Sequence, residues 1–319
     1  MEKVNFKDEW EEMCPIFIKE KNHYTHIGTG VLLSIWNKTY LLTVAHIVDF
    51  IYENNQELYI PSNEGNFIQI DGKLFHNSLV YNQNRADDKI DFSYFELSEQ
   101  MVLNIIQIFK PLLEKQICLS TDFSFNTLTK EVRNDNRKRK SLVCNEIRER
   151  YKELNSLSED EVKEYNDIAI KRRITFAGYP LNKTSKQSGI IKSEIVYYHG
   201  GAVNQSTYKE EALDENIHII SEFGRAGAYK DDIVFSDFTK PQGISGGGVY
   251  RIIRTDDGFD RELIGIGHTY LAKKHLFIGT NIRYCLDIIK NNRLMPYEVY
   301  NRLESMTKIL AQKYIDESK

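Results

Sequence analysis

Short apolar runs rich in β-branched and aromatic residues recur along the chain, separated by turns that contain Asn, Gly or Ser. Runs of this length, bounded by turn residues, are typical of β-strands in antiparallel sheets. They cluster in two regions, one in the first third of the chain and one from residue 174 onward. The pattern therefore predicts a mainly β protein with two β-rich regions. The expected strands cover residues 15–19, 30–36, 39–45, 57–60, 67–70, 91–97, 174–179, 189–198, 217–222, 232–235, 247–254, 263–270 and 276–280.

Helical spacing of apolar positions marks the segments between and after these regions. One expected helix covers residues 101–109, and two more lie at 284–290 and 296–313. Over residues 122–173 the sequence becomes strongly polar, with apolar residues at helical spacing within 142–154. We therefore expect a helical insertion between the two β regions.

The chain has 319 residues, more than the usual single domain of about 100–150 residues, so two packed units are expected. Hydrophobic residues make up 41% and charged residues 28%, and the mean hydropathy is −0.47. These values argue against a wholly disordered chain and a multi-span membrane protein. Acidic residues precede any apolar run at the N-terminus, which does not fit a secretory signal, so we expect a cytoplasmic protein.

Charge is nearly balanced, with 42 Lys and Arg against 46 Asp and Glu, for a net charge of −4. The protein as a whole therefore has no electrostatic attraction to nucleic acid or to an anionic membrane. The basic run 133–140 is a local exception, because Lys and Arg clusters can contact phosphates. No aromatic residues interleave this run for base stacking, so a solvated loop is the preferred interpretation.

Metal and cofactor sites have no signature in the sequence. The four cysteines, Cys14, Cys118, Cys144 and Cys285, are far apart and show no C-x-x-C spacing. This distribution predicts reduced, mostly buried thiols rather than a disulfide framework or a zinc site. Phosphate-binding, dinucleotide-binding and H-E-x-x-H motifs are also absent from the sequence, so we expect chemistry without a metal or a cofactor.

A serine bracketed by glycines marks the segment 240–250, where Gly243 precedes Ser245 and three glycines follow it. Such a loop can turn sharply, present the Ser245 hydroxyl and aim successive N–H groups at one point, as an oxyanion hole requires. A glycine-rich hairpin turn would have the same pattern. The loop alone leaves both interpretations open.

A serine nucleophile requires a base, which is usually a histidine held by a buried carboxylate. His46 ends an apolar run, at a point where a helical turn can begin. Asp91 opens an apolar strand and is the candidate for orienting His46. Asp87 and Asp88 are alternatives, but they lie in a polar turn where solvated carboxylates are expected.

Four segments, 28–33, 42–46, 91–97 and 243–247, together resemble the trypsin-like serine proteases with the chymotrypsin fold, in an intracellular bacterial-type form. The order His, Asp, Ser agrees with that family, and the insertion accounts for the long separation between the last two. The resemblance implies a double antiparallel β-barrel. The parts of the chain are then an N-terminal segment and first barrel (1–121), a helical and basic insertion (122–173), a second barrel (174–290) and a C-terminal helical extension (291–319).

The resemblance also implies roles for individual residues. Ser245 resembles the acylated nucleophile, His46 the general base and Asp91 the carboxylate that orients it. The N–H groups of Gly243 and Ser245 resemble the oxyanion hole. The implied substrate-binding residues are Thr239, Gly267, His268 and Thr269.

Two departures from the family refine this expectation. Ile244 stands where zymogen-type members carry an Asp, so activation by a newly cut N-terminus is not expected. Thr239 supplies no acid near the pocket floor, which argues against a preference for Arg or Lys. His268 could hydrogen-bond an acidic or amide side chain, although a shift of one residue along a strand would turn it away. The other histidines are expected to be ordinary surface or structural residues: His23, His26, His76, His199, His218 and His275.

The expected function is cleavage of polypeptides by a serine endopeptidase through an acyl-enzyme, with narrow specificity or control by a protein partner. The alternative is a catalytically silent trypsin-like fold that acts as a protein-binding module. A weaker third hypothesis is nucleic-acid binding through the basic run 133–140. No membrane partner is expected.

Overall fold

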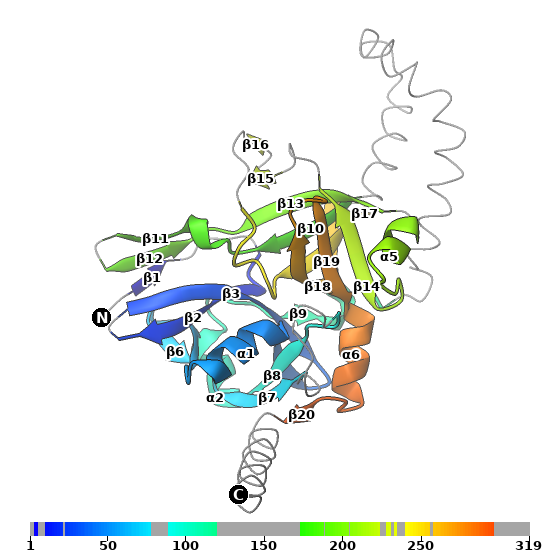
Figure 1. Cartoon of the computed structure of the whole chain (residues 1–319). Helices are drawn as coiled ribbons and strands as arrows, with labels where there is room; N and C mark the ends of the chain where they lie inside the picture. Colours follow the sequence, from blue (N-terminus) through cyan, green and yellow to red (C-terminus); the bar gives the residue numbers. More distant parts are fainter. Residues whose placement is uncertain are drawn as a thin grey trace, which may run out of the picture.

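The computed structural model describes residues 3–5, 10–21, 23–77, 89–119, 173–187, 189–203, 205–223, 228–230, 233–234, 240–255 and 258–296. Several expectations lie outside these residues: the insertion up to residue 172, the basic run 133–140, the helix beyond residue 296, Asp87, Asp88, Cys144 and Thr239. The described part is mainly β with few helices, as the sequence predicts (Figure 1).

The first β region forms a curved, open sheet. Its strand order is β20-β7-β8-β4-β3-β2-β5-β6, and β9 pairs with β3 in parallel. No pairing among the described residues joins β6 back to β20, so this sheet is a half-barrel. Its strands are β2 (Met13–Glu20), β3 (His23–Ile35), β4 (Lys38–Thr43), β5 (Leu58–Pro61), β6 (Phe67–Gln69), β7 (Gly72–His76), β8 (Ser93–Leu97), β9 (Leu112–Leu113) and β20 (Met295–Pro296).

The second β region forms a closed barrel of six strands. Closure is set by β10, which pairs with β17 on one side and with β13 on the other. The ring runs β10-β17-β18-β19-β14-β13, and β15 (Ala228–Lys230) and β16 (Ile233–Val234) extend it from β13. The barrel strands are β10 (Arg173–Gly178), β13 (Val196–Ala202), β14 (His218–Glu222), β17 (Gly248–Thr255), β18 (Gly258–Leu271) and β19 (Leu276–Asn281).

A small third sheet and a few helices complete the described fold. The sheet contains β1 (Lys3–Asn5), β12 (Ile190–Ser193) and β11 (Thr184–Gln187) in that order. The helices are α1 (Ala45–Glu53), α2 (Glu99–Ile105), α5 (Gln205–Glu210) and α6 (Ile282–Lys290), with short 3₁₀ turns η2 (Glu114–Gln116) and η3 (Leu181–Lys183). No helix among the described residues has the length and apolar character needed to cross a membrane.

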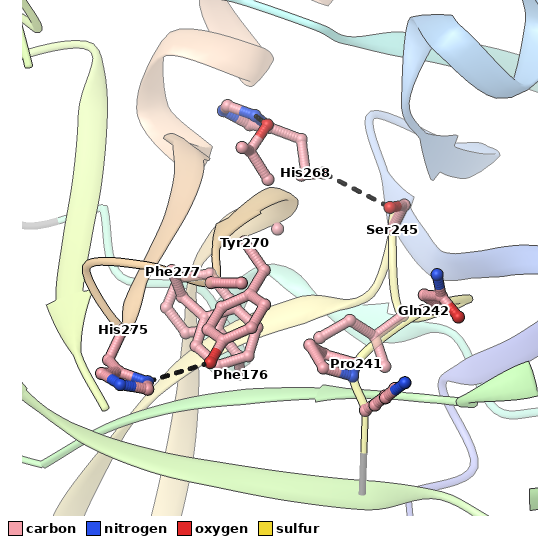
Figure 2. Close-up of a pocket in the computed structure, with 13 residues that line it drawn as sticks. Phe176, Pro241, Gln242, Ser245, His268, Tyr270, His275 and Phe277 are labelled. Carbon is pink, nitrogen blue, oxygen red and sulfur yellow. Dashed lines mark hydrogen bonds between the residues drawn. The ribbon is translucent and has the colours of Figure 1, made fainter. Parts of the chain in front are cut away.

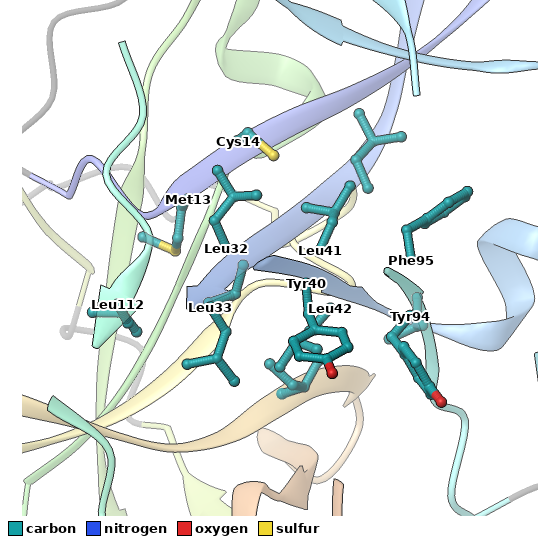
Figure 3. Packing of buried hydrophobic residues seen from close by; sticks show 14 of the residues in the cluster. Met13, Cys14, Leu32, Leu33, Tyr40, Leu41, Leu42, Tyr94, Phe95 and Leu112 are labelled. Atoms are coloured by element: carbon teal, nitrogen blue, oxygen red, sulfur yellow. The ribbon is translucent and has the colours of Figure 1, made fainter. Parts of the chain in front are cut away.

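Apolar residues of β2, β3, β4, β8 and β9 pack into one core (Figure 3). Leu41 and Leu42 are both fully buried although successive strand side chains point to opposite faces, so both faces of β4 are covered. Ile282 and Cys285 of α6 and Ile266 of β18 belong to the same core cluster. The two β regions therefore share apolar packing.

Most predicted elements are present, and the differences have local causes. The run predicted over 39–45 ends at Thr43, because α1 begins at Ala45. The run predicted over 189–198 divides into β12 and β13 between Ser193 and Val196. The short helix α5 and several strands were not predicted, namely β1, β7, β9, β11, β15 and β20. Three cysteines are free and buried, as expected: Cys14, Cys118 and Cys285.

Candidate active site

His46 lies in the first turn of α1, immediately after β4. The N–H groups of a first helical turn have no partner within the helix. The Asp91 carboxylate fills this role and also holds the ring. The His46 backbone N–H donates to Asp91 Oδ1 at 2.9 Å, and Nδ1 lies 2.6 Å from Oδ2. A neutral ring that donates from Nδ1 presents Nε2 as a proton acceptor, which is the state a general base requires.

Asp91 lies just before β8, with a side chain only 7% exposed, whereas the His46 side chain is 38% exposed. Burial raises the pKa of the Asp91 carboxyl, but hydrogen bonds from His46 and the nearby His46 and His268 rings outweigh it and lower the pKa below its ordinary value. The carboxylate therefore stays ionised around neutral pH. It can fix the His46 ring and stabilise its protonated form.

Ser245 lies in the loop that leads into β17, at one wall of a pocket (Figure 2). Its hydroxyl donates to the carbonyl oxygen of His268 at 3.3 Å, so its proton is directed to β18 rather than to His46. Two further bonds tie the loop to the same strand: the Gly246 N–H donates to Gly267 O, and the Gly267 N–H donates to Gly247 O, both at 2.8 Å. The loop is therefore held along its length by β18.

The peptide groups before Gly243 and before Ser245 both have their carbonyl oxygens bonded. Gln242 O accepts from the Leu181 N–H at 2.7 Å, and Ile244 O accepts from the Gly247 N–H at 2.8 Å. In a trans peptide the N–H points opposite to the carbonyl. The Gly243 and Ser245 N–H groups thus point away from these internal partners, and among the described residues neither donates a backbone hydrogen bond.

Glycine is required at two positions of this loop, because atoms of the first sheet lie against Gly246 and atoms of Leu181 lie against Gly243. Gly246 has a φ of +86°, and a Cβ there would lie 2.1 Å from the Thr29 carbonyl oxygen and 2.5 Å from Thr43 Oγ1. Gly243 has a φ of +96°, and its Cβ would lie 2.8 Å from the Leu181 nitrogen. Left-handed backbone and close approach both exclude a side chain.

Thr29 of β3 holds the Ser245 loop from the first sheet. Its N–H donates to Ser245 O at 2.9 Å, and its hydroxyl donates to Gly243 O at 2.9 Å. The same hydroxyl accepts from the Tyr179 N–H at 3.0 Å. Three bonds therefore join this one residue to the second region.

The start of α1 and the Ser245 loop both lie close to Gly28. A Cβ on Gly28 would lie 2.2 Å from Ile47 Cδ1 and 3.3 Å from Ser245 O. Ile47 directly follows His46, so the start of α1 and the Ser245 loop both lie against the side of Gly28 where a Cβ would stand. The structure thus joins His46 to Asp91 by two hydrogen bonds and places the Ser245 loop near the start of α1, whereas the Ser245 hydroxyl bonds His268 O.

The pocket beside Ser245 has a volume of about 510 Å³. Three of the predicted substrate-binding residues line it: Gly267, His268 and Thr269. An aromatic wall of Phe176, Tyr270 and Phe277 faces the loop segment of Pro241 and Gln242 (Figure 2). Phe277 stacks on Phe176 with ring centroids 5.0 Å apart, and Tyr270 Oη lies 3.3 Å from His275 Nδ1.

The His268 ring is buried, and its Nδ1 lies 2.8 Å from Thr269 Oγ1. Of the histidines expected to be ordinary, His26, His76 and His218 are buried and hydrogen-bonded, and His275 lines the pocket. Among the described residues no group of His, Cys, Asp and Glu side chains could hold a metal ion.

Sequence reasoning missed Thr29 and Thr43 as site residues. Thr29 lies within the Gly28–Gly30 segment that carried the family resemblance, but nothing in the sequence identifies its partner, which lies 214 residues away. Comparison with known proteins adds no assignment: no protein-family model matches the chain, and no curated protein matches it in sequence.

Proposed function

We propose that this protein is a serine endopeptidase of the trypsin-like type, in which the half-barrel sheet and the closed barrel correspond to the two barrels of that fold. One observation carries the proposal: the Asp91 carboxylate binds both the backbone N–H and Nδ1 of His46, beside the glycine-rich loop of Ser245. A buried carboxylate that fixes one face of an imidazole leaves the other face to act on a hydroxyl.

The chemistry follows from these groups. Ser245 Oγ attacks the scissile carbonyl while its proton passes to His46 Nε2, and the developing imidazolium is stabilised by Asp91. The peptide C–N bond then breaks as His46 donates that proton to the leaving amine. Water, activated by His46, hydrolyses the acyl-enzyme and restores the Ser245 hydroxyl.

The oxyanion formed during attack needs donors that are already aimed at it. The peptide orientation at Gly243 and Ser245 supports this role, because both preceding carbonyls are bonded on the opposite side. The glycine at 243 allows the φ of +96° on which that orientation depends.

The described pocket lining supports a preference against basic side chains. No acidic residue is among the described lining residues, whereas Lys240 and His275 are. Burying a substrate cation there would leave it without a counter-charge. An apolar or aromatic side chain fits the wall of Phe176, Tyr270 and Phe277. We further propose that narrow specificity or a protein partner limits activity on other polypeptides.

A second candidate function has its own supporting observation. The Ser245 hydroxyl donates to His268 O rather than to His46, as would suit a silent fold used as a protein-binding module. Under the first proposal, a rotation about the Ser245 χ1 torsion redirects the same proton to His46 when substrate binds.

Labelling with a fluorophosphonate probe separates the two. We expect the purified protein, alone or with a cell lysate that supplies a partner, to be labelled on Ser245. The variants Ser245→Ala and His46→Ala should lose at least about 10³-fold in labelling rate. Ser34→Ala, which changes a serine outside the site, should be labelled like the wild type. Absence of labelling under both conditions would contradict the protease and favour the binding module.

A further inference from the structure

The segment that carries Asp91 is held by the second barrel. Asp91 lies two residues before the first ladder pair of β8, which begins at Ser93. No strand pairing among the described residues therefore fixes the backbone at Asp91. The two residues before it, Lys89 and Ile90, instead give their carbonyl oxygens to side chains of β14 and β19.

His218 of β14 supplies the first of these bonds. Its Nε2 lies 2.7 Å from Lys89 O, and its Nδ1 lies 3.1 Å from the Asp214 nitrogen and 2.9 Å from the Asp214 carbonyl oxygen. A carbonyl oxygen only accepts, so Nε2 must carry a proton in the neutral and the charged ring alike. Nδ1 has an Asp214 partner in either state, since it can accept from the N–H or donate to the carbonyl.

Thr280 of β19 supplies the second bond, from its hydroxyl to Ile90 O at 3.0 Å. His218 and Thr280 are direct partners in the β14–β19 ladder, so their side chains stand next to each other on one face. Both are buried, with 3% and 1% of their surface exposed. The adjacent side chains of His218 and Thr280 thus donate hydrogen bonds to two consecutive carbonyl oxygens.

We propose that His218 and Thr280 are positioning residues that place the Asp91 carboxylate on His46 from across the junction; this rests on the proposed function. The carboxylate must meet both the backbone N–H and Nδ1 of His46, and a small displacement breaks one of the two bonds. Neither positioning residue contacts the substrate or the reacting atoms. Their effect passes through the backbone of Lys89 and Ile90.

Matched substitutions isolate the two donors. Thr280→Val removes the hydroxyl while keeping the shape, and Thr280→Ser keeps the hydroxyl. His218→Met and His218→Gln are similar linear side chains, of which only Gln can donate to Lys89 O. Thr175→Val is the control, because it removes another buried hydroxyl from the same barrel, one that bonds His199 instead.

Two readouts are compared at equal folded fraction. The first is the kinetics of probe labelling and peptide cleavage, where Thr280→Val and His218→Met should lower kcat about 10- to 100-fold with KM nearly unchanged. The second is the downfield proton resonance of the His46–Asp91 bond, read also in the Ser245→Ala background, which should shift or broaden in the same two variants. Thr280→Ser and His218→Gln should restore both signals toward wild type.

The proposal is overturned if Thr280→Val and His218→Met match Thr175→Val within about twofold in rate and leave the downfield resonance in place. If the wild type is never labelled, the protease proposal fails separately. The resonance comparison still decides whether the two residues position Asp91, because it does not depend on turnover.

Discussion

Six strands of the half-barrel sheet follow the same order as the six strands of the closed barrel, but only the barrel is closed. The six compared strands are β2, β3, β4, β5, β7 and β8 in the sheet and β10, β13, β14, β17, β18 and β19 in the barrel. When each set is numbered along the chain, both have the spatial order 5-6-3-2-1-4: β7-β8-β4-β3-β2-β5 in the sheet and β18-β19-β14-β13-β10-β17 in the barrel. In the barrel the fourth and fifth strands, β17 and β18, pair in a long hairpin, and the ring is complete because β10 pairs with both β17 and β13. In the sheet β5 instead pairs with β6, and β7 pairs with β20.

This difference separates two tasks. The open sheet carries the His46 and Asp91 pair, and the closed barrel carries the Ser245 loop. Each is held by the other: Thr29 of the sheet bonds the Ser245 loop, while His218 and Thr280 of the barrel bond the segment before Asp91. The site therefore belongs to the junction, and neither half contains it alone.

The largest effect on stability and labelling is expected at Gly246, where atoms of the half-barrel sheet lie against the Ser245 loop. Gly246→Ala introduces a Cβ 2.1 Å from Thr29 O at a left-handed φ, so the loop must move. We expect a loss of about 2 to 5 kcal/mol in unfolding free energy and at least about 100-fold in probe labelling. Gly201→Ala is the control, since a Cβ there meets nothing within 4 Å. Wild-type labelling of Gly246→Ala would show that the junction does not shape the loop.

Removal of the Thr29 hydroxyl tests the hold of the sheet on the loop directly. Thr29→Val leaves Gly243 O and the Tyr179 N–H without their buried partner, which should cost about 2 to 5 kcal/mol. We expect labelling about 10-fold slower or more, measured beside urea unfolding. Thr29→Ser keeps the oxygen and should stay close to wild type. Equal losses for Ser and Val would assign the effect to packing rather than to the two hydrogen bonds.

A third comparison uses pH at a contact between the half-barrel sheet and the small third sheet. His26 of β3 donates from Nε2 to Gly28 O at 2.7 Å, and its Nδ1 lies 3.1 Å from the Thr184 hydroxyl of β11. Burial lowers the His26 pKa from 6.5 to about 4, against the raising effect of the Gly28 hydrogen bond. The unfolded state therefore binds a proton at higher pH than the folded state does.

Stability should then fall as pH decreases from about 6.5 to about 4, by up to about 3 kcal/mol, and this contribution should be level above 6.5. Urea unfolding at several pH values measures this loss. His26→Gln should lack that portion of the slope, whereas His23→Gln, at an exposed position of the same strand, should keep it. Asp91, whose pKa is lowered, adds a further loss only as pH falls below about 3.8. If the unfolding free energies of wild type and His26→Gln fall equally between about pH 6.5 and about pH 4, the loss does not come from His26.

The smallest effect compares one ion pair from each half. Arg251 and Glu262 face each other across the β17–β18 hairpin and are mostly buried, whereas Lys38 and Glu96 lie at the surface of the sheet with Lys38 51% exposed. Arg251→Met should cost about 1 to 2 kcal/mol and Lys38→Met no more than about 0.5 kcal/mol in unfolding free energy. A larger loss for Lys38→Met than for Arg251→Met would contradict the expectation that the partly buried pair on the hairpin contributes more to stability than the exposed pair on the sheet.

The sequence is sufficient to predict most strands, because their periodicity and turn residues are local signals. It also predicts Ser245, His46 and Asp91 as candidate site residues, since each lies next to a recognisable run; the structure joins His46 to Asp91, and the catalytic roles of all three stay a prediction. The polar strand β7 was missed because Gly72–His76 lacks an apolar alternation. Helix α5 was missed for a similar reason: six mostly polar residues give no periodic signal.

The contacts that hold the site could not be predicted in the same way. His218 lies in a run that predicts only a strand, and its bond to Lys89 spans 129 residues of sequence. Thr280 is likewise an ordinary strand residue until β14 and β19 pair and turn it toward Ile90. Such roles arise from the packing of two halves, which no local pattern encodes.

The bond from Thr29 to Gly243 joins residues 214 positions apart, and it has a consequence during synthesis. Strands β2 to β8 leave the ribosome before the barrel, so His46 and Asp91 exist for some time without the Ser245 loop and without Thr280. Contacts this distant in sequence form late in folding. Under the proposed function, a nascent chain therefore carries no working nucleophile until the barrel has been made and docked.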